Sequence, residues 1–259
     1  MKVTVCQLST ELDTLDNHWQ QLVRHTKHHR SDLVLLPEMS FHTWICSLEA
    51  VDVELWKKAI ESHNLWIQRL LELGVDFVIG TRPVIHPETN KRYNSGYVWS
   101  ANLGIKDLHE KVYLPDEEGF WEATWYDRGE KSFPVFSLGG VTIGFSICTE
   151  LWFMEHAREY AKQGIHILAV PRATPFETVD KWIAGGRAAA VISGAFCISS
   201  NHQGMALDNE TILGGVGWII DPEGNILERT DESNPFKTLE IDIDIAERAK
   251  STYPRYVLG

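Results

Sequence analysis

The stretch Val141-Thr142-Ile143-Gly144-Phe145-Ser146-Ile147-Cys148 is an apolar run that ends in a lone thiol. A run of this kind predicts a buried β-strand. A helical pattern follows over residues 153–163 and closes at Gly164, a residue typical of a helix C-terminus. A second apolar run covers residues 165–170. Strand, helix and strand in this order predict an α/β fold of layered sheets and helices.

The same alternation continues through the rest of the chain. Apolar runs predict further strands at residues 3–8, 33–36, 75–79, 94–99, 108–113, 196–200, 215–220, 227–230 and 239–243. Helical spacing predicts helices at residues 15–29, 53–73 and 178–195. The sequence has no linker, low-complexity segment or repeat, so we expect one domain over residues 1–259.

The composition limits the possible classes of function. The chain has 259 residues, of which 44% are hydrophobic, and this is enough for one sizeable core. Its ten tryptophans argue against a disordered chain. The formal net charge of −12 argues against binding to nucleic acid or to an anionic membrane surface. We therefore expect neither of these partners.

The cysteines indicate the compartment. Cys6, Cys46, Cys148 and Cys197 have no paired spacing, so they predict no disulfide framework and fit a reducing environment. The N-terminal residues begin a strand and lack the anatomy of a signal peptide. No apolar stretch approaches the roughly 18 residues that a membrane span needs. The sequence therefore predicts a cytoplasmic protein.

Three strand-like runs end in, or carry, a reactive side chain. Cys148 ends the run quoted above, Glu38 follows Leu35-Leu36-Pro37, and Lys111 lies within residues 108–115. A thiol, a carboxylate and an ammonium can serve as nucleophile, base and oxyanion stabiliser. The thiol needs a base or a lowered pKa to react at neutral pH. No histidine occupies a strand end near a cysteine motif, so a carboxylate in an apolar pocket is the better candidate base.

Each of these residues alone has a simpler interpretation. A lone cysteine after an apolar strand is more often a packing residue. A glutamate at a strand end is more often a surface or capping group, and a lysine in a strand more often faces solvent. The motifs that surround Glu38, Lys111 and Cys148 decide between the two interpretations.

Those motifs resemble the nitrilase superfamily, the carbon–nitrogen hydrolases. Leu35-Leu36-Pro37-Glu38-Met39 resembles the glutamate motif of that family, and residues 109–115 resemble its lysine motif. Residues 144–153 resemble its cysteine elbow, and residues 219–224 resemble its late hairpin. The likeness follows the order of motifs in the family and extends over nearly the whole chain.

The resemblance implies a four-layer αββα sandwich of the nitrilase type. It implies that Glu38 is the general base, Lys111 the transition-state stabiliser and Cys148 the nucleophile. Many members carry a second glutamate after the lysine, in a motif like Phe-x-Glu-x-x-x-Tyr, and residues 120–126 are similar, with Glu122 in that place. Glu117 and Glu118 are alternatives for this role that the sequence alone does not separate.

The resemblance also implies a reaction. An amidase-type hydrolase cleaves a non-peptide carbon–nitrogen bond of a small amide, here an ω-amide or an N-carbamoyl compound, through a cysteine thioester. Amidase-like members usually read Cys-aromatic-Asp and nitrilases Cys-Trp-Glu, whereas this chain reads Cys148-Thr149-Glu150. The amide N–H of Thr149 can still complete an oxyanion hole with Lys111. The compact length favours an amidase, and the alternatives are a nitrile hydrolase and an inactive binding or scaffold protein.

Neither a cofactor nor a metal is expected. His25, His28 and His29 share a polar helical face without an adjacent acidic or thiol partner, which is typical of a solvated face. The expected partners are a small amide and water. The family resemblance further implies a homodimer or a larger homo-oligomer.

Arg172 and three tryptophans are further candidates for substrate binding. Arg172 ends the strand that follows the cysteine strand, where its guanidinium can hold a substrate carboxylate, and the alternative is a structural ion pair. Trp121, Trp125 and Trp152 flank the motifs, and they either wall the pocket or pack within the core.

Overall fold

The structure is a computed structural model that describes residues 1–257. Its α-helices are α1 (Leu12–His29), α2 (Val53–Ile67), α3 (Glu122–Trp125), α4 (Met154–Lys162), α5 (Val179–Ser193) and α6 (Ile243–Ala249). Its strands are β1 (Lys2–Ser9), β2 (Leu33–Leu35), β3 (Phe77–Ile85), β4 (Arg92–Ser100), β5 (Gly104–Glu110), β6 (Phe136–Leu138), β7 (Val141–Phe145), β8 (Ile167–Pro171), β9 (Phe196–Met205), β10 (Ile212–Leu213), β11 (Trp218–Ile220), β12 (Ile226–Arg229) and β13 (Phe236–Glu240). Short 3₁₀ helices lie between them: η1 (Ile45–Ser47), η2 (Leu70–Leu73), η3 (Cys148–Trp152) and η4 (Phe176–Thr178).

Strand β1 connects two sheets. Its first part pairs with β2 on one side and with β13 on the other, whereas its last residues, Gln7 to Ser9, pair with β9. The strand order is β5-β4-β3-β2-β1-β9-β8-β7-β6, with β11 and β12 added beside β9. One sheet therefore extends from β1 towards β5, and the other extends from β9 towards β6.

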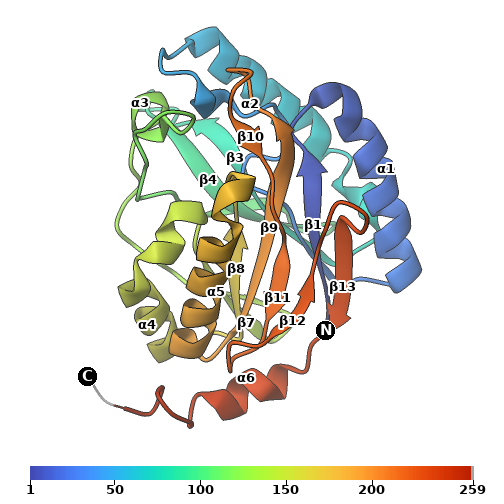
Figure 1. The fold of residues 1–259 in the computed structure, drawn as a ribbon, viewed down its shortest axis with the longest axis vertical. Coiled ribbons are helices and arrows are strands. Elements are labelled where there is room, and N and C mark those ends of the chain that lie inside the picture. Colours follow the sequence, from blue (N-terminus) through green and yellow to red (C-terminus); the bar gives the residue numbers. More distant parts are fainter. Residues whose placement is uncertain (258–259) are drawn as a thin grey trace.

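The two sheets pack face to face between two layers of helices. Val5 and Leu35 of the first sheet share a buried cluster with Ile143 and Phe145 of the second. The contact is close, because a Cβ added to Gly96 would lie 2.9 Å from the Phe145 ring. Helices α1 and α2 lie across the first sheet, and α4 and α5 lie side by side across the second (Figure 1). The predicted αββα sandwich is confirmed.

The directions of the strands bring distant motifs to one edge. Strands β1, β2 and β3 run parallel, and β5 shares their direction because β4 is antiparallel to both of its neighbours. Strands β7, β8 and β9 run parallel to β1 as well. Glu38, Lys111 and Cys148 each follow the carboxyl end of one of these strands. The carboxyl edge of parallel strands is where α/β proteins commonly bind ligands.

Two predicted elements were wrong. The helix predicted over residues 53–73 ends at Ile67, and a separate 3₁₀ helix, η2, carries Leu70 and Leu73 into the cluster beneath α1. Gly74 then reverses the chain with a φ of 64°, which glycine adopts without strain. The strand predicted to reach residue 243 stops earlier, because the Asp242 side chain accepts from the Asp244 N–H and starts α6.

No helix within residues 1–257 combines the length and the apolar character needed to cross a membrane.

Candidate active site

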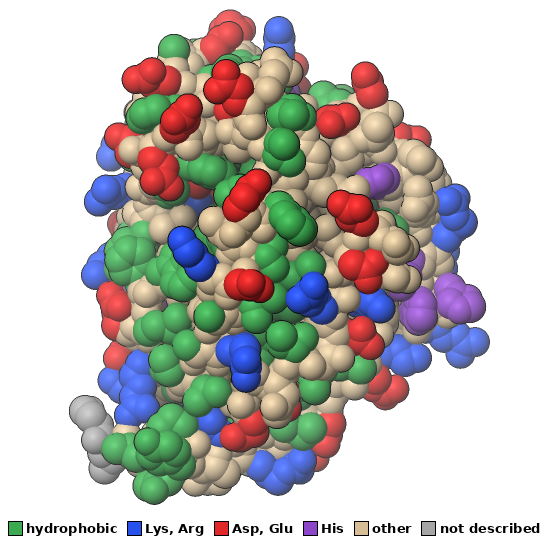
Figure 2. Space-filling model, viewed as in Figure 1, with side chains coloured by type: hydrophobic (Ala, Val, Ile, Leu, Met, Phe, Trp, Pro, Cys, Tyr) green, Lys and Arg blue, Asp and Glu red, His purple; other side chains and the backbone are tan. Residues whose placement is uncertain are grey.

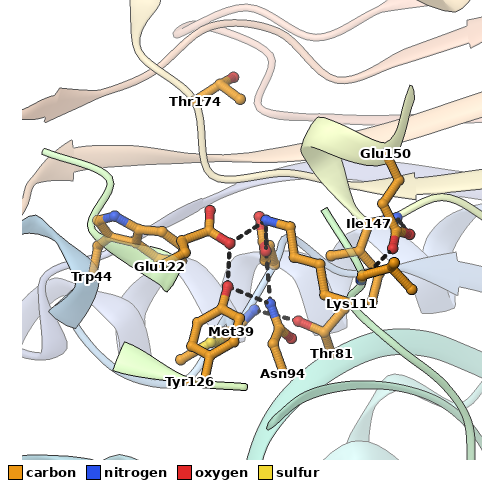
Figure 3. Close-up of polar contacts among 12 residues, drawn as sticks. Met39, Trp44, Thr81, Asn94, Lys111, Glu122, Tyr126, Ile147, Glu150 and Thr174 are labelled. Atoms are coloured by element: carbon orange, nitrogen blue, oxygen red, sulfur yellow. Dashed lines mark hydrogen bonds and ion pairs between the residues drawn. The ribbon is translucent and has the colours of Figure 1, made fainter. Parts of the chain in front are cut away.

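Lys111 is the centre of the polar cluster at this edge. Its side chain is fully buried, and its ammonium donates to Glu38 Oε1 at 2.7 Å and to Glu122 Oε2 at 2.5 Å (Figure 3). Burial alone would lower the pKa of Lys111, but the two carboxylates raise it well above its usual value. The ammonium therefore stays charged, and one of its three N–H groups remains for a third acceptor.

Glu38 is held by both its side chain and its backbone. Asn94 Nδ2 donates to Glu38 Oε1 at 2.7 Å, while Glu38 Oε2 is buried with no hydrogen-bond partner among residues 1–257. His202 Nε2 lies 2.5 Å from the Glu38 carbonyl oxygen, and the Met39 N–H donates to Thr81 Oγ1 at 2.7 Å. One carboxylate oxygen is thus fixed, and the other is free to accept a proton or a hydrogen bond.

Glu122, the first residue of α3, is the glutamate that meets the lysine. Its Oε2 also accepts from the Tyr126 hydroxyl, and its Oε1 is buried without a partner in the described part of the chain. Burial raises the pKa of Glu122 to about 7, against the opposing effect of Lys111. Glu117 and Glu118 are exposed on the loop before α3, so the structure brings neither of them to Lys111.

Cys148 is the first residue of η3 and lies at a strained turn that follows β7. Its φ is 71°, in the left-handed region that costs a residue with a side chain about 1–2 kcal/mol. Such strain is often found at functional sites. The residue is only 3% exposed. Burial raises its pKa, the Glu38 carboxylate raises it further, and Lys111 opposes both effects. Cys148 is therefore a protonated thiol at neutral pH and needs a base to become a nucleophile.

Glu150 was not assigned a role from sequence, although its motif departs from the family pattern. Its Oε1 accepts from the Val112 N–H at 2.7 Å, and its Oε2 accepts from the Ile147 N–H at 2.8 Å (Figure 3). His109 Nε2 lies 2.9 Å from Oε1 and 2.8 Å from Oε2. One buried carboxylate therefore joins the residue after Lys111 to the residue before Cys148.

Arg172 is buried and bonded to the protein. Its guanidinium donates to Ser199 Oγ at 2.7 Å, to Thr174 Oγ1 at 2.8 Å and to the Val216 carbonyl oxygen at 2.5 Å. It also stacks on Trp218, with its central carbon 4.0 Å from the ring centroid. Burial lowers the pKa of Arg172 to about 9. The alternative of a structural ion pair is wrong for residues 1–257, because no carboxylate pairs with Arg172 there.

These contacts favour a structural role for Arg172 within the sheet. Three of the five N–H groups of the guanidinium are already used on the protein. Carboxylate binding by Arg172 stays a prediction that only kinetics can test.

The tryptophans lie in different surroundings. Trp125 is buried and donates from Nε1 to the Leu48 carbonyl oxygen at 2.6 Å, which is a packing role. Trp121 is partly buried beside the apolar cluster that contains Trp125, and its backbone N–H donates to the Cys46 carbonyl oxygen. Trp152 is 43% exposed and packs against Trp182 of α5, with ring centroids 4.9 Å apart. A pocket-lining role for Trp121 and Trp152 stays a prediction, as does the Thr149 N–H as a donor.

The polar cluster has the composition of a proton-transfer site. Within residues 1–257, no group of three or more histidine, cysteine or acidic side chains is arranged to hold a metal ion. Two carboxylates flank one ammonium, and a thiol lies near enough for Glu38 and Lys111 to shift its pKa. This arrangement can remove a proton from the thiol and stabilise a developing negative charge.

Comparison with known proteins identifies relatives of similar length. A sequence model of the carbon–nitrogen hydrolase family matches residues 2–251. N-carbamoylputrescine amidase of Arabidopsis thaliana is 24% identical over 251 residues, covering 90% of this chain and 83% of the relative. Citrullinase of Francisella tularensis is 26% identical over 247 residues, covering 90% and 85%.

A solved structure supports the fold independently. A carbon–nitrogen hydrolase from Helicobacter pylori superposes with a TM-score of 0.86 at 20% identity, covering 98% of this chain and 94% of that one. At this level of identity the likeness shows that the two chains share the nitrilase-type sandwich.

Proposed function

The chain belongs to the carbon–nitrogen hydrolase family, and from this premise we propose that Cys148 attacks the carbonyl carbon of a small amide to form a thioester. The carrying observation is the Lys111 ammonium, which bonds Glu38 and Glu122 at once beside the buried thiol. A solvent-facing lysine or a capping glutamate would not be enclosed in this way. The enzyme is an amidase-type hydrolase, and the assignment of roles to its residues is our proposal.

The first half of the reaction forms the thioester. Glu38 Oε2, which has no other partner within residues 1–257, takes the proton of the Cys148 thiol. The thiolate adds to the amide carbonyl carbon, and the carbonyl oxygen becomes an oxyanion. The third N–H of Lys111 and the Thr149 N–H donate to this oxyanion. Glu38 returns the proton to the departing nitrogen, so the carbon–nitrogen bond breaks and ammonia or an amine leaves.

The second half of the reaction uses water. Glu38 accepts a proton from water, and the hydroxide oxygen adds to the thioester carbonyl carbon. The carbon–sulfur bond breaks, the carboxylic acid leaves, and the proton returns to the Cys148 sulfur. Glu122 stays in contact with Lys111 throughout, and its free Oε1 accepts from the N–H of the substrate amide. Both carboxylates therefore have separate tasks around one ammonium.

The substrate class follows from the relatives and the site. The relatives include an N-carbamoylputrescine amidase, a citrullinase and an ω-amidase. We therefore propose that an ω-amide or an N-carbamoyl amine is the substrate of this chain. The experiment is a panel of ω-amides, N-carbamoyl amines and nitriles with detection of released ammonia. Turnover of nitriles alone would instead assign a nitrilase.

The same panel tests the inactive alternative. If no compound is hydrolysed and Cys148 does not react with iodoacetamide, the chain is a scaffold that has kept the fold. Formation of an acyl-enzyme, seen as a mass increase on intact wild-type protein and absent in Cys148→Ala, would establish the thioester.

We further propose a cytoplasmic homodimer or larger homo-oligomer. All four cysteines are free and buried, which suits a reducing compartment. Exposed apolar side chains, including Trp152 and Phe176, lie near the α5 face and can contribute to an interface between copies. Light scattering coupled to size-exclusion chromatography measures the mass of the particle, and a monomer at micromolar concentration would contradict this part of the proposal.

A further inference from the structure

We propose that Glu150 and His109 form a positioning pair that holds Lys111 and Cys148 in the geometry needed for the reaction. This inference rests on the proposed function and names two residues that do not themselves touch the substrate. Glu150 and His109 are separated by 41 positions in the sequence, and each lies two residues from a reactive side chain.

The carboxylate of Glu150 divides its two oxygens between two chain segments. Oε1 accepts from the N–H of Val112, directly after Lys111, and Oε2 accepts from the N–H of Ile147, directly before Cys148. The distances are 2.7 Å and 2.8 Å, and the side chain of Glu150 is fully buried. The planar carboxylate therefore fixes how far apart the two segments lie.

His109 completes the pair with a positive charge. Its Nε2 faces both oxygens of Glu150, and its Nδ1 faces the Ser132 carbonyl oxygen at 3.2 Å. Both ring nitrogens therefore face acceptors, so the ring that satisfies both contacts is the doubly protonated imidazolium. The pKa of His109 is raised in agreement: burial lowers it, but the charge of Glu150 outweighs burial.

The neighbouring charged groups are compatible with a protonated His109. Glu110, beside His109 on β5, raises the pKa of His109, and His156 of α4 lies near enough to be influenced by both members. The Phe133 ring covers His109, with centroids 4.9 Å apart. The pair is thus enclosed, and its ionic hydrogen bonds are not weakened by bulk water.

A neutral residue at position 150 should lower kcat. A glutamine at position 150 has one acceptor oxygen and one NH₂ group, so it cannot accept from both Val112 and Ile147. One backbone N–H would face another donor, and the two segments would move apart. Misplacement of reacting groups by about 1 Å can cost about 100-fold in rate. Since binding of the amide does not need this exact spacing, we expect the loss in kcat and not in KM.

The test compares Glu150→Gln and His109→Gln with the wild type on a small amide. We expect kcat to fall about 100-fold in the first and about 10-fold in the second, with KM changed less than about threefold. Glu150→Asp keeps two acceptor oxygens and should recover part of the lost kcat. His109→Gln is the milder variant, and it provides the test if Glu150→Gln does not fold.

His166→Gln is the matched control. His166 bonds Glu247 through Nε2 and accepts from the Thr142 N–H through Nδ1 at 2.8 Å, but it contacts neither Lys111 nor Cys148. The kcat of His166→Gln should stay within about threefold of wild type. The comparison is made at a temperature where circular dichroism shows that all variants are folded. A Glu150→Gln enzyme with the kcat of this control would overturn the proposal.

Hydrogen exchange separates this proposal from the proposed function. Glu150→Gln should speed amide exchange at residues 109–113 and 145–149 and leave other segments unchanged. If the wild type hydrolyses no amide but exchange rises at both segments, the function is wrong and the holding role of Glu150 stands. Unchanged exchange at both segments would refute the holding role, whatever the activity.

Discussion

The Lys111 ammonium lies 2.5 Å from Glu122 Oε2. The two residues are 11 positions apart, and the segment between them has little regular structure. The chain reverses between them, and α3 begins at Glu122 so that its side chain turns inward. The backbone N–H of Trp121 donates to the Cys46 carbonyl oxygen, and the indole N–H of Trp44 donates to the Gly119 carbonyl oxygen. These two hydrogen bonds hold the reversal against residues 44–46. The second carboxylate is therefore placed by a local turn, whereas Glu38 is placed by the sheet.

Replacement of the proposed nucleophile should abolish turnover without unfolding the chain. Cys148→Ala removes only the thiol from a buried site, so the fold should persist while ammonia release falls below detection. Cys6→Ala and Cys197→Ala should lower the free energy of unfolding by about 1–3 kcal/mol and leave kcat nearly unchanged. Thermal unfolding and ammonia assays on purified variants measure both quantities. Hydrolysis by purified Cys148→Ala would end the thioester mechanism.

The role of Glu122 can be measured separately from that of Glu38. Glu122→Ala leaves the Lys111 ammonium with Glu38 alone. It also removes the proposed acceptor for the N–H of the substrate amide. We expect kcat to fall by about 100-fold or more, while circular dichroism shows a folded protein. Glu117→Ala and Glu118→Ala are matched controls, because both side chains are exposed on the loop before α3. Normal kinetics in Glu122→Ala, with a loss in either control, would move the role to that residue.

The pH dependence should report the same carboxylate. The pKa of Glu122 is raised to about 7 by burial. Above this pH the carboxylate is ionised and pairs with Lys111; as pH falls through 7 it becomes protonated and the pair is lost. We therefore expect kcat/KM to decrease on the acid side of about pH 7. The apparent value belongs to the coupled cluster with Glu38 and Lys111.

Glu122→Gln is the control for this profile, since glutamine cannot titrate. Its lower activity should show no acid limb near pH 7. A limb that persists unchanged in Glu122→Gln would assign the titration to a different group.

The sequence predicted the three residues that follow strands, because strand direction alone decides where a strand-end residue lies. Glu38, Lys111 and Cys148 fall at one edge for that reason. The sequence did not decide which of three acidic residues, Glu117, Glu118 and Glu122, contacts Lys111. Only the turn into α3 shows that Glu122 points inward. Glu150 was missed because its role depends on His109, a contact between distant segments that no local pattern reveals.

Helix and strand limits failed for a different reason. The pattern over residues 53–73 is apolar enough for one helix, but the chain must turn to start β3, and packing of Leu70 and Leu73 against α1 decides where it breaks. Tertiary packing thus overrides local propensity at this point. The surroundings of Arg172 were equally hidden, because the Ser199 hydroxyl comes from β9 and the Val216 carbonyl oxygen comes from the segment before β11.

Arg172→Met should act mainly on stability. The guanidinium gives three hydrogen bonds to buried groups that methionine cannot replace. Loss of hydrogen bonds from a buried charged group should lower the free energy of unfolding by about 3 kcal/mol or more. We expect similar losses of kcat/KM on neutral and carboxylate-bearing amides at a temperature where the variant is folded. A rise in KM confined to the carboxylate-bearing amide would restore the substrate role.

The charge of the preferred substrate should follow from the acidic side chains at the end of the molecule that carries α3. Figure 2 shows acidic side chains gathered over the end of the molecule where Figure 1 places α2 and α3. Exposed acidic residues on the segments that precede α2, α3 and β10 include Glu49, Asp116, Glu117, Glu118 and Glu210. Their negative potential attracts cations and repels anions. Among amides of equal length, one bearing an amino group should therefore have a higher kcat/KM than one bearing a carboxylate.

The preference should weaken with salt, because exposed charges are screened at a Debye length of about 8 Å at physiological ionic strength. It should also weaken in the double variant Glu117→Gln and Glu118→Gln, which removes two charges near α3. The double variant Glu232→Gln and Glu240→Gln removes two exposed charges from the region of β13 and is the matched control. If both double variants reduce the preference for the amino-bearing amide equally, the net charge of the protein alone is responsible. If the wild type prefers the carboxylate-bearing amide, the acidic loops do not select the substrate and a buried cation does.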